Sequence, residues 1–199
     1  MNRFYQNAHT GFYPLFKLLF PFDAEGLENL PRDRAFILCP NHSNAVDPIL
    51  VCLSLPRTVP IRIMAKKELM DKPLLGRFLA ALGAFGVDRG HSDIAALKTS
   101  IKAVKDGENL LIFPEGTRVK EPGEVQAKGG VAMIALRTGA VLIPVYAGRR
   151  RKLLRKTHIV FGEAYEPKTE TRHGTAEEYQ AFADEVLRRA YALGEEKQA

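Results

Sequence analysis

The sequence is poor in cysteine, with only Cys39 and Cys52 among its 199 residues. Their spacing forms no metal-binding pattern and supplies no disulfide framework. Both lie in apolar runs, which predicts buried free thiols and a reducing compartment. Internal repeats, low-complexity segments and long linkers are also absent from the sequence. We therefore expect a single domain, since a chain of this length is within the usual size range of one and suffices to bury a core.

An apolar run of the roughly 20 residues that span a bilayer is missing as well. The strongly apolar and aromatic stretch at residues 12–22 is shorter, and Lys17 and two prolines interrupt it. No small-residue cleavage site follows this stretch, which argues against a signal peptide. Two interpretations stay open: the stretch packs in the core, or it lies in the headgroup region of a membrane as an interfacial anchor.

The net charge of +6 is concentrated at residues 149–156, where six of eight residues are basic. Such a run suits anionic lipid, nucleic acid or simple solvation. No recognisable nucleic-acid module accompanies it, so we expect no nucleic-acid partner. Together with the apolar N-terminal stretch, the run favours peripheral or monotopic attachment to the cytoplasmic side of a membrane, without a spanning helix. We take residues 1–22 as the interfacial segment and residues 23–199 as the globular domain.

Apolar runs of strand length alternate with helical patterns along the chain. The runs are continuous, as expected for strands that are covered on both faces, and they lie at residues 35–39, 61–65, 84–87, 110–113, 141–146 and 158–161. Helical patterns lie at residues 94–104, 125–138 and 179–190, and glycines at 107 and 139 are placed to end the first two. This alternation predicts the α/β class: a single-domain sandwich with a largely parallel central sheet flanked by helices. In such sheets, functional residues collect where strands end and loops begin.

The first predicted strand leads into a loop that contains His42 and Asp47. Five residues turn about 500° around a regular helix, so the two side chains must lie in a loop or turn if they are to meet. There they would fit a general base and a carboxylate that holds its tautomer and orientation. The alternative for Asp47 is an N-cap, because Pro48 follows it at a first helical position. No serine or cysteine nucleophile is required if the hydroxyl of an acceptor attacks.

The fourth predicted strand opens into Glu115, Gly116, Thr117 and Arg118. This sequence places a carboxylate, a flexible backbone, a hydroxyl and a guanidinium at one edge of the sheet. The planar fork of an arginine suits a phosphate, and a glutamate accepts hydrogen bonds from substrate hydroxyls. The alternative is a tight turn with an exposed ion pair.

A further predicted strand, within residues 83–89, delivers Arg89 at its end. Two arginines at strand exits would form a convergent anion site if Arg89 and Arg118 lie on adjacent strand ends.

Taken together, these blocks resemble the glycerolipid acyltransferase family, whose best-known members are the 1-acyl-sn-glycerol-3-phosphate acyltransferases. The matching blocks, in the family's order, are the His-x-x-x-x-Asp of 42–47, residues 83–89, the Phe-Pro-Glu-Gly-Thr-Arg of 113–118 and the Val-Leu-Ile-Pro-Val of 141–145. Shorter similarities at residues 65–69, 73–76 and 128–129 extend the resemblance over roughly residues 34–148. A lone His-x-x-x-x-Asp arises often by chance, whereas four blocks in order are highly specific.

The resemblance implies an acyltransferase domain that moves a fatty acyl group from acyl-CoA or acyl carrier protein to a lysophospholipid hydroxyl. The expected reaction acylates the sn-2 hydroxyl of 1-acyl-glycerol-3-phosphate and gives phosphatidic acid for phospholipid biosynthesis. By matching position, His42 is the general base and Asp47 orients it, while Arg89 and Arg118 hold the acceptor's phosphate. The segment Glu115–Thr117 shapes that site. The resemblance implies no metal and no bound cofactor, because the thioester is a co-substrate.

The sequence departs from the family inside the first block, where many members carry a serine with a bulky or aromatic residue. This chain has Asn44 and Ala45 there. Glycerol-3-phosphate, another lysophospholipid or an amino-acid lipid therefore stays open as the acceptor. A different class also stays open: a non-catalytic membrane-surface lipid-binding protein, which the basic run and the apolar N-terminus alone would explain.

Overall fold

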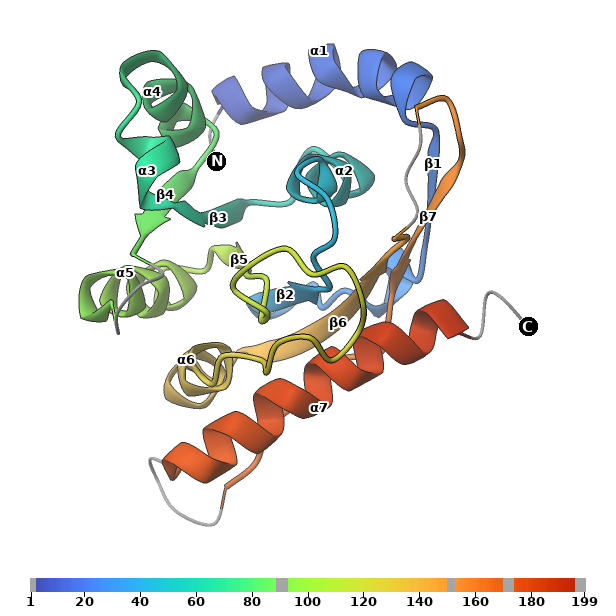
Figure 1. Cartoon of the computed structure of the whole chain (residues 1–199). Helices are drawn as coiled ribbons and strands as arrows, with labels where there is room; N and C mark the ends of the chain where they lie inside the picture. The colour runs from blue at the N-terminus through green and yellow to red at the C-terminus, as the bar shows by residue number, and fades with distance from the viewer. Residues whose placement is uncertain (1–2, 89–92, 150–152, 170–173, 196–199) are drawn as a thin grey trace.

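A computed structural model describes residues 3–88, 93–149, 153–169 and 174–195, which form one seven-stranded sheet with helices on both faces (Figure 1). The strands are β1 (Phe22–Glu25), β2 (Phe36–Pro40), β3 (Ile61–Lys66), β4 (Ala84–Val87), β5 (Asn109–Leu111), β6 (Val141–Ala147) and β7 (Thr157–Phe161). The helices are α1 (Arg3–Leu19), the 3-10 turn η1 (Leu27–Asn29), α2 (Asp47–Ser54), α3 (Lys67–Met70), α4 (Pro73–Ala81), α5 (Ile94–Lys105), α6 (Gly130–Thr138) and α7 (Ala176–Glu195).

The strand order is β1-β7-β6-β2-β5-β3-β4, and every neighbouring pair is parallel except β6 with β7. The short connection from β6 to β7 explains the exception, because antiparallel strands need no long crossover. The predicted α/β fold with a largely parallel sheet is thus confirmed. Strand β1 was not predicted, since its Phe-Asp-Ala-Glu sequence is not a continuous apolar run.

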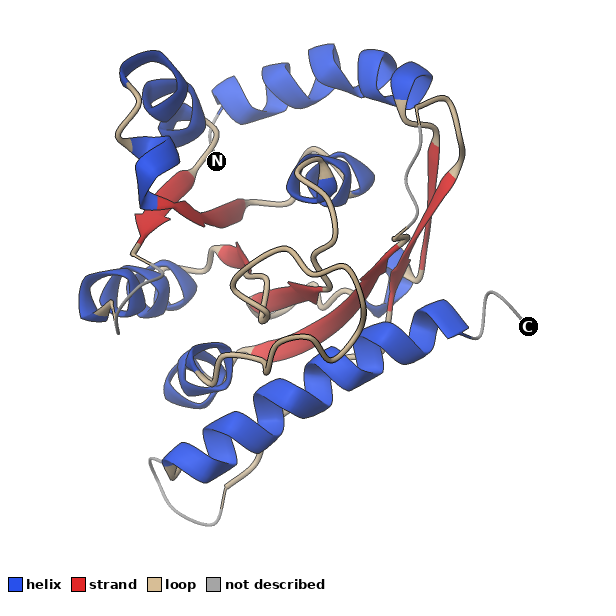
Figure 2. Cartoon of the chain, viewed as in Figure 1, coloured by secondary structure: helices blue, strands red, loops and turns tan. Residues whose placement is uncertain are grey.

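The two faces of the sheet are buried by different helices (Figure 2). Alternate side chains of β2 point to opposite faces, as the strand period of two requires. Phe36 and Leu38 pack with α2 and the buried side of α1, whereas Ile37 and Cys39 pack with α5, α6 and α7. Both predicted thiols are free and buried, as expected. Strand β2 is therefore the centre of the core, and its carboxyl end leaves the sheet between the two helical layers.

Two of the three predicted helices have the expected ends. Helix α5 is followed by Gly107 with φ +83°, and α6 ends at Gly139 with φ +73°, the left-handed conformation that favours glycine. The predicted start of the second helix at residue 125 is wrong, because α6 begins at Gly130. The preceding backbone is held by α7 instead: Ala127 N donates to Asp184 Oδ1 at 3.2 Å, and Gln180 Nε2 donates to Ala127 O at 2.6 Å.

The N-terminal segment forms a helix that is buried on one side and exposed on the other. Tyr5 is buried, and His9 Nε2 lies 3.0 Å from the carbonyl oxygen of Leu55 at the end of α2. Leu15 and Leu18 are exposed. The core interpretation is thus confirmed for the buried side of α1, and an interfacial role for the exposed side stays a prediction. Phe22, which the prediction placed in this segment, is a buried residue of β1, and the division into residues 1–22 and 23–199 stays a prediction.

Within the described ranges, none of the helices is long and apolar enough to cross a membrane.

Candidate active site

The loop after β2 is fixed to its neighbouring strand by Asn41. This fully buried side chain donates to Ala147 O at 3.1 Å and accepts from Ala147 N at 2.7 Å, which extends the pairing of β2 with β6 beyond the last strand residue. Because buried polar groups are costly unless they are hydrogen-bonded, this pair of hydrogen bonds fixes the chain one residue before His42.

The side chains of His42 and Asp47 meet, as a loop of this spacing allows. His42 Nδ1 lies 3.1 Å from Asp47 Oδ2, and the same carboxylate oxygen accepts from the backbone N–H groups of Ser43 at 2.7 Å and Asn44 at 2.8 Å. The N-cap interpretation of Asp47 is wrong: Val46 is the N-cap of α2, and no side-chain cap forms there. Asp47 is instead the first residue of the helix, and its carboxylate turns back to close the loop.

This geometry sets the state of the imidazole. Because an ionised carboxylate only accepts hydrogen bonds, the neutral imidazole has its proton on Nδ1 and a lone pair on Nε2. No described residue hydrogen-bonds Nε2, and the ring packs on Phe113 with 4.2 Å between the ring centroids. The arrangement is that of a general base whose tautomer and orientation are held by a carboxylate.

Glu115 is buried, with 3% of its surface exposed, and both carboxylate oxygens have protein partners. His42 N donates to Oε2 at 2.6 Å, and the hydroxyl of Tyr191 donates to Oε1. Burial raises the pKa of Glu115 above its ordinary value, although the bonds from Tyr191 and His42 partly oppose the shift. The interpretation of this turn as an exposed ion pair is therefore wrong. A contact between Glu115 and substrate stays a prediction.

The turn after Glu115 returns to the histidine loop. Gly116 has φ +68°, a left-handed conformation that favours glycine, while a Cβ there would meet only the flexible side chain of Lys128. Thr117 and Arg118 are exposed, and Val119 N donates to His42 O at 2.8 Å. Arg118 therefore precedes Val119, the residue whose amide binds the backbone carbonyl of His42.

The predicted convergence of two arginines is not tested, because Arg89 lies outside the described residues. The strand before it, β4, is separated from β2 by β5 and β3.

The departure from the family pattern has a local explanation at Asn44. Its side-chain oxygen accepts from Val46 N at 3.2 Å, while its backbone N–H binds Asp47. Asparagine commonly stabilises a turn in this way.

Sequence reasoning missed two residues, Tyr191, which binds Glu115, and Arg149, whose charge acts on Tyr191. Tyr191 comes from α7, where it shares the amphipathic pattern of the helix and belongs to no motif. Arg149 was interpreted only as the first residue of the basic run. Its side chain is 20% exposed, its Nη2 pairs with Glu121 at 3.2 Å, and its Nε is buried without a hydrogen-bond partner among the described residues.

A cavity of about 700 Å³ adjoins the site between α5 and α6. Phe113 and Gly116 belong to its lining, together with apolar residues such as Met64, Leu97 and Ile134. Because the His42 ring packs on Phe113, this mostly apolar cavity lies next to the base.

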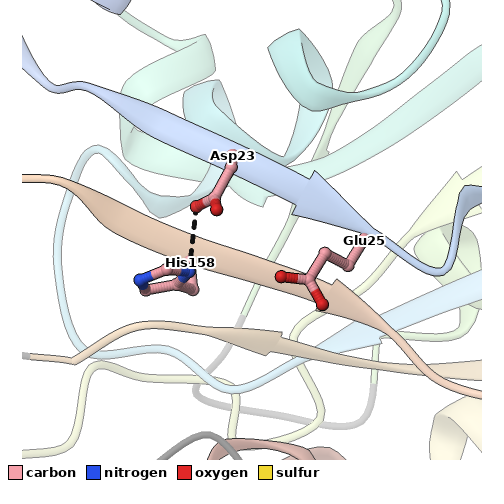
Figure 3. A group of neighbouring side chains, drawn as sticks. All are labelled: Asp23, Glu25 and His158. Atoms are coloured by element: carbon pink, nitrogen blue, oxygen red, sulfur yellow. Dashed lines mark ion pairs between the residues drawn. The ribbon is translucent and has the colours of Figure 1, made fainter.

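Among the described residues, one group has the ligand types and spacing of a metal site: Asp23, Glu25 and His158, on β1 and β7 (Figure 3). Their ligand atoms lie within 4.8 Å of one another, and Asp23 Oδ1 is 3.0 Å from His158 Nδ1. Lys156 Nζ lies 3.1 Å from the other oxygen of Asp23, and an ammonium there competes with a cation. Although burial opposes it, Lys156 and His158 hold the pKa of Asp23 below its usual value. We interpret the group as an ion-pair network, separated from β2 by β6.

Comparison with known proteins gives the family. The family model described as Acyltransferase matches residues 21–148. The 1-acyl-sn-glycerol-3-phosphate acyltransferase of Bacillus subtilis (strain 168) is 41% identical over 117 residues, which are 59% of this chain and 57% of that protein. The protein of the same name from Borreliella burgdorferi is 34% identical over 122 residues, which are 60% of this chain and 48% of that protein. The chain thus matches about half the length of these curated relatives.

A solved structure supports the same assignment over most of the chain. The crystal structure of the 1-acyl-sn-glycerophosphate acyltransferase from Thermotoga maritima is similar with a TM-score of 0.69 and 26% sequence identity. The match covers 96% of this chain and 78% of that one. The family match includes the segments that carry His42, Asp47 and the turn from Glu115 to Arg118. From its sequence, its fold and the geometry of these blocks, the chain belongs to the acyltransferase family.

Proposed function

We propose that the protein transfers a fatty acyl group from a thioester to the sn-2 hydroxyl of 1-acyl-glycerol-3-phosphate, giving phosphatidic acid. The observation that carries the proposal is the His42–Asp47 pair, in which a buried carboxylate holds Nδ1 and no described residue hydrogen-bonds Nε2. The names of the relatives support this acceptor. Acyl-CoA or acyl carrier protein supplies the thioester, and we propose that no metal or bound cofactor takes part.

In this reaction His42 Nε2 takes the proton of the acceptor hydroxyl as its oxygen attacks the thioester carbonyl. A C–O bond forms, the tetrahedral intermediate collapses, the C–S bond breaks, and the imidazolium returns its proton to the leaving thiolate. Asp47 stabilises the imidazolium that forms between these steps and keeps the ring in place.

We assign the acceptor's phosphate to the basic groups at this edge of the sheet. Arg118 is exposed beside the His42 loop, and its planar guanidinium suits two phosphate oxygens. Arg149 follows β6, whose last residue is bonded to Asn41, so it extends from the neighbouring strand end. Arg89 keeps the role implied by the family resemblance.

The apolar cavity beside Phe113 suits a fatty acyl chain. Its volume of about 700 Å³ is within the range of ligand sites, and its lining is mostly aliphatic. A chain placed there would bring its carbonyl end toward His42, because Phe113 contacts both.

Membrane attachment is supported by a continuous apolar face on α1 and α4. The ring of Phe78 on α4 packs edge-on against Phe4 and Phe12 of α1, with centroids 6.1 and 6.0 Å apart. All three are exposed, and Leu74 on α4 is 84% exposed. Large exposed apolar patches mark interaction sites. Exposed basic residues, namely Lys67, Lys72 and Arg77, lie in or just before α4 in the sequence and suit anionic lipid.

The test is a transfer assay on vesicles that contain the lysophospholipid, with acyl-CoA and acyl carrier protein thioesters compared as donors. We expect phosphatidic acid from 1-acyl-glycerol-3-phosphate. His42→Ala should lower the rate about 10² to 10⁴-fold, the usual contribution of a general base.

Glycerol-3-phosphate, a neutral lysophospholipid and an amino-acid lipid serve as alternative acceptors. Faster transfer to one of these would correct the acceptor but keep the chemistry. Near-normal turnover by folded His42→Ala would contradict the mechanism, and absence of any transfer with intact vesicle binding would favour a lipid-binding protein.

A further inference from the structure

Helix α7 lies outside the range of the family match, yet it contacts the segment that holds the base. It runs along β6 on the face opposite α1 and α2 (Figure 1). Gly194 fixes this position, because a Cβ there would overlap the ring of Tyr146 on β6. The close approach sets Tyr191, one turn earlier, next to Glu115.

A hydrogen-bonded chain connects this helix to the backbone of the base. The hydroxyl of Tyr191 donates to Glu115 Oε1, and the amide of His42 donates to Glu115 Oε2 at 2.6 Å. The backbone of Glu115 lies in a turn in which Gly116 N donates to Phe113 O at 3.0 Å. His42 is thus fixed through its ring by Asp47, through its carbonyl by Val119, and through its amide by Glu115, which Tyr191 binds.

We propose that Tyr191 is a positioning residue for acyl transfer, and that α7 completes the active site by holding Glu115 against the backbone of His42. This inference rests on the proposed function. Loss of the hydroxyl removes one of the two donors to a buried carboxylate, and hydrogen bonds to charged groups are the stronger ones. The carboxylate then holds the His42 amide less well.

The same contact affects the pH range of activity. The groups that act on the charge of Glu115 are His42 and Asp47, which follow β2, and Tyr191 on α7. Tyr191 is affected in turn by Tyr146 on β6 and by Arg149, which follows β6. The Tyr191 bond opposes the rise in the pKa of Glu115 that burial causes. Without the bond that pKa rises further, so Glu115 becomes protonated at a higher pH.

The test compares Tyr191→Phe with Tyr179→Phe, which removes a hydroxyl from the buried side of the same helix. We expect kcat of Tyr191→Phe to fall about 10 to 100-fold with the acceptor KM unchanged. The acid limb of its pH profile should move to higher pH, while the Tyr179→Phe profile matches the wild type. Equal losses in both variants would indicate a general effect on α7 and overturn the inference, as would an unchanged acid limb in Tyr191→Phe.

A second measurement separates this inference from the proposed function. Exchange of the His42 amide hydrogen, followed by NMR, should be faster in Tyr191→Phe than in the wild type or Tyr179→Phe. If the wild type transfers acyl groups and these readouts do not change, the inference fails and the function stands. If the wild type transfers none, the function fails, and unchanged exchange would then refute the link between α7 and the His42 backbone as well.

Discussion

The sheet edge around His42 contains polar residues that are buried, whereas the helical face of α1 and α4 contains apolar residues that are exposed. At the edge, Asn41, Asp47 and Glu115 are polar but buried, and hydrogen bonds hold each of them. On the face, Leu74 and Phe78 are apolar but exposed. Folding alone would favour neither arrangement, because buried polar groups require partners and exposed apolar groups lose the benefit of burial.

The difference separates two kinds of requirement on the same domain. Hydrogen bonds fix Asn41, Asp47 and Glu115 at the edge, and a fixed environment is what a base needs in order to keep one tautomer and orientation. The face has apolar groups that the described fold leaves uncovered, which suits a fluid partner such as a lipid surface. A change at the edge should therefore alter turnover, and a change on the face should alter where turnover occurs.

The largest effect is expected from Asp47→Ala, which removes the common acceptor of the His42 ring and two backbone amides. We expect activity to fall about 10² to 10⁴-fold. Leaving buried donors unpaired should also cost about 1 to 3 kcal/mol in the free energy of unfolding. Transfer assays and urea titrations measure the two losses.

A matched control is the capping box at the start of α7, where Glu178 N donates to Thr175 Oγ1 at 3.2 Å. Thr175→Ala should cost about 1 kcal/mol of stability and leave turnover intact. Equal activity losses in the two variants would remove the distinction between the edge and the rest of the fold.

A smaller effect is expected on the helical face from Leu74→Glu. The side chain is 84% exposed, so the fold should tolerate the change, whereas insertion into a membrane interface should not. We expect binding to anionic vesicles to weaken about tenfold or more, as measured by sedimentation. Thr99→Glu adds the same charge to an exposed position of α5, on the other side of the sheet. Similar weakening in both variants would point to charge alone, and the assignment of the face would fail.

The smallest effect concerns stability at the edge. The pKa of Glu115 is raised in the folded protein. Its contribution to stability is therefore fully present at pH values below the ordinary pKa of a glutamate, and it is lost as the pH rises through the pKa of the folded state. Glu115→Gln keeps a group of the same shape without the charge. We expect its Tm to exceed that of the wild type at pH 8, with the difference vanishing below about pH 4, and its turnover to be lower. A lower Tm at pH 8, measured by calorimetry, would contradict the cost assigned to this buried charge.

The parts that sequence reasoning predicted well depend on neighbours along the chain. Strand β4 has the predicted limits, and Gly107 and Gly139 end the helices they were expected to end. Strand β1 was missed because its mixed sequence forms a strand only by pairing with β7. The start of α6 was misplaced because residues of α7, far along the chain, bind the backbone before it.

For the site, the sequence by itself determined that His42 and Asp47 need a loop to meet, since their spacing excludes a shared helical face. It also determined the order of the blocks that identify the family. Only the tertiary structure decided that Asp47 closes the loop rather than capping α2, and that Glu115 is buried under Tyr191, 76 residues away. The physical reason is that local patterns act over a few residues, whereas a contact between a strand end and a distant helix exists only once the core has packed the two together.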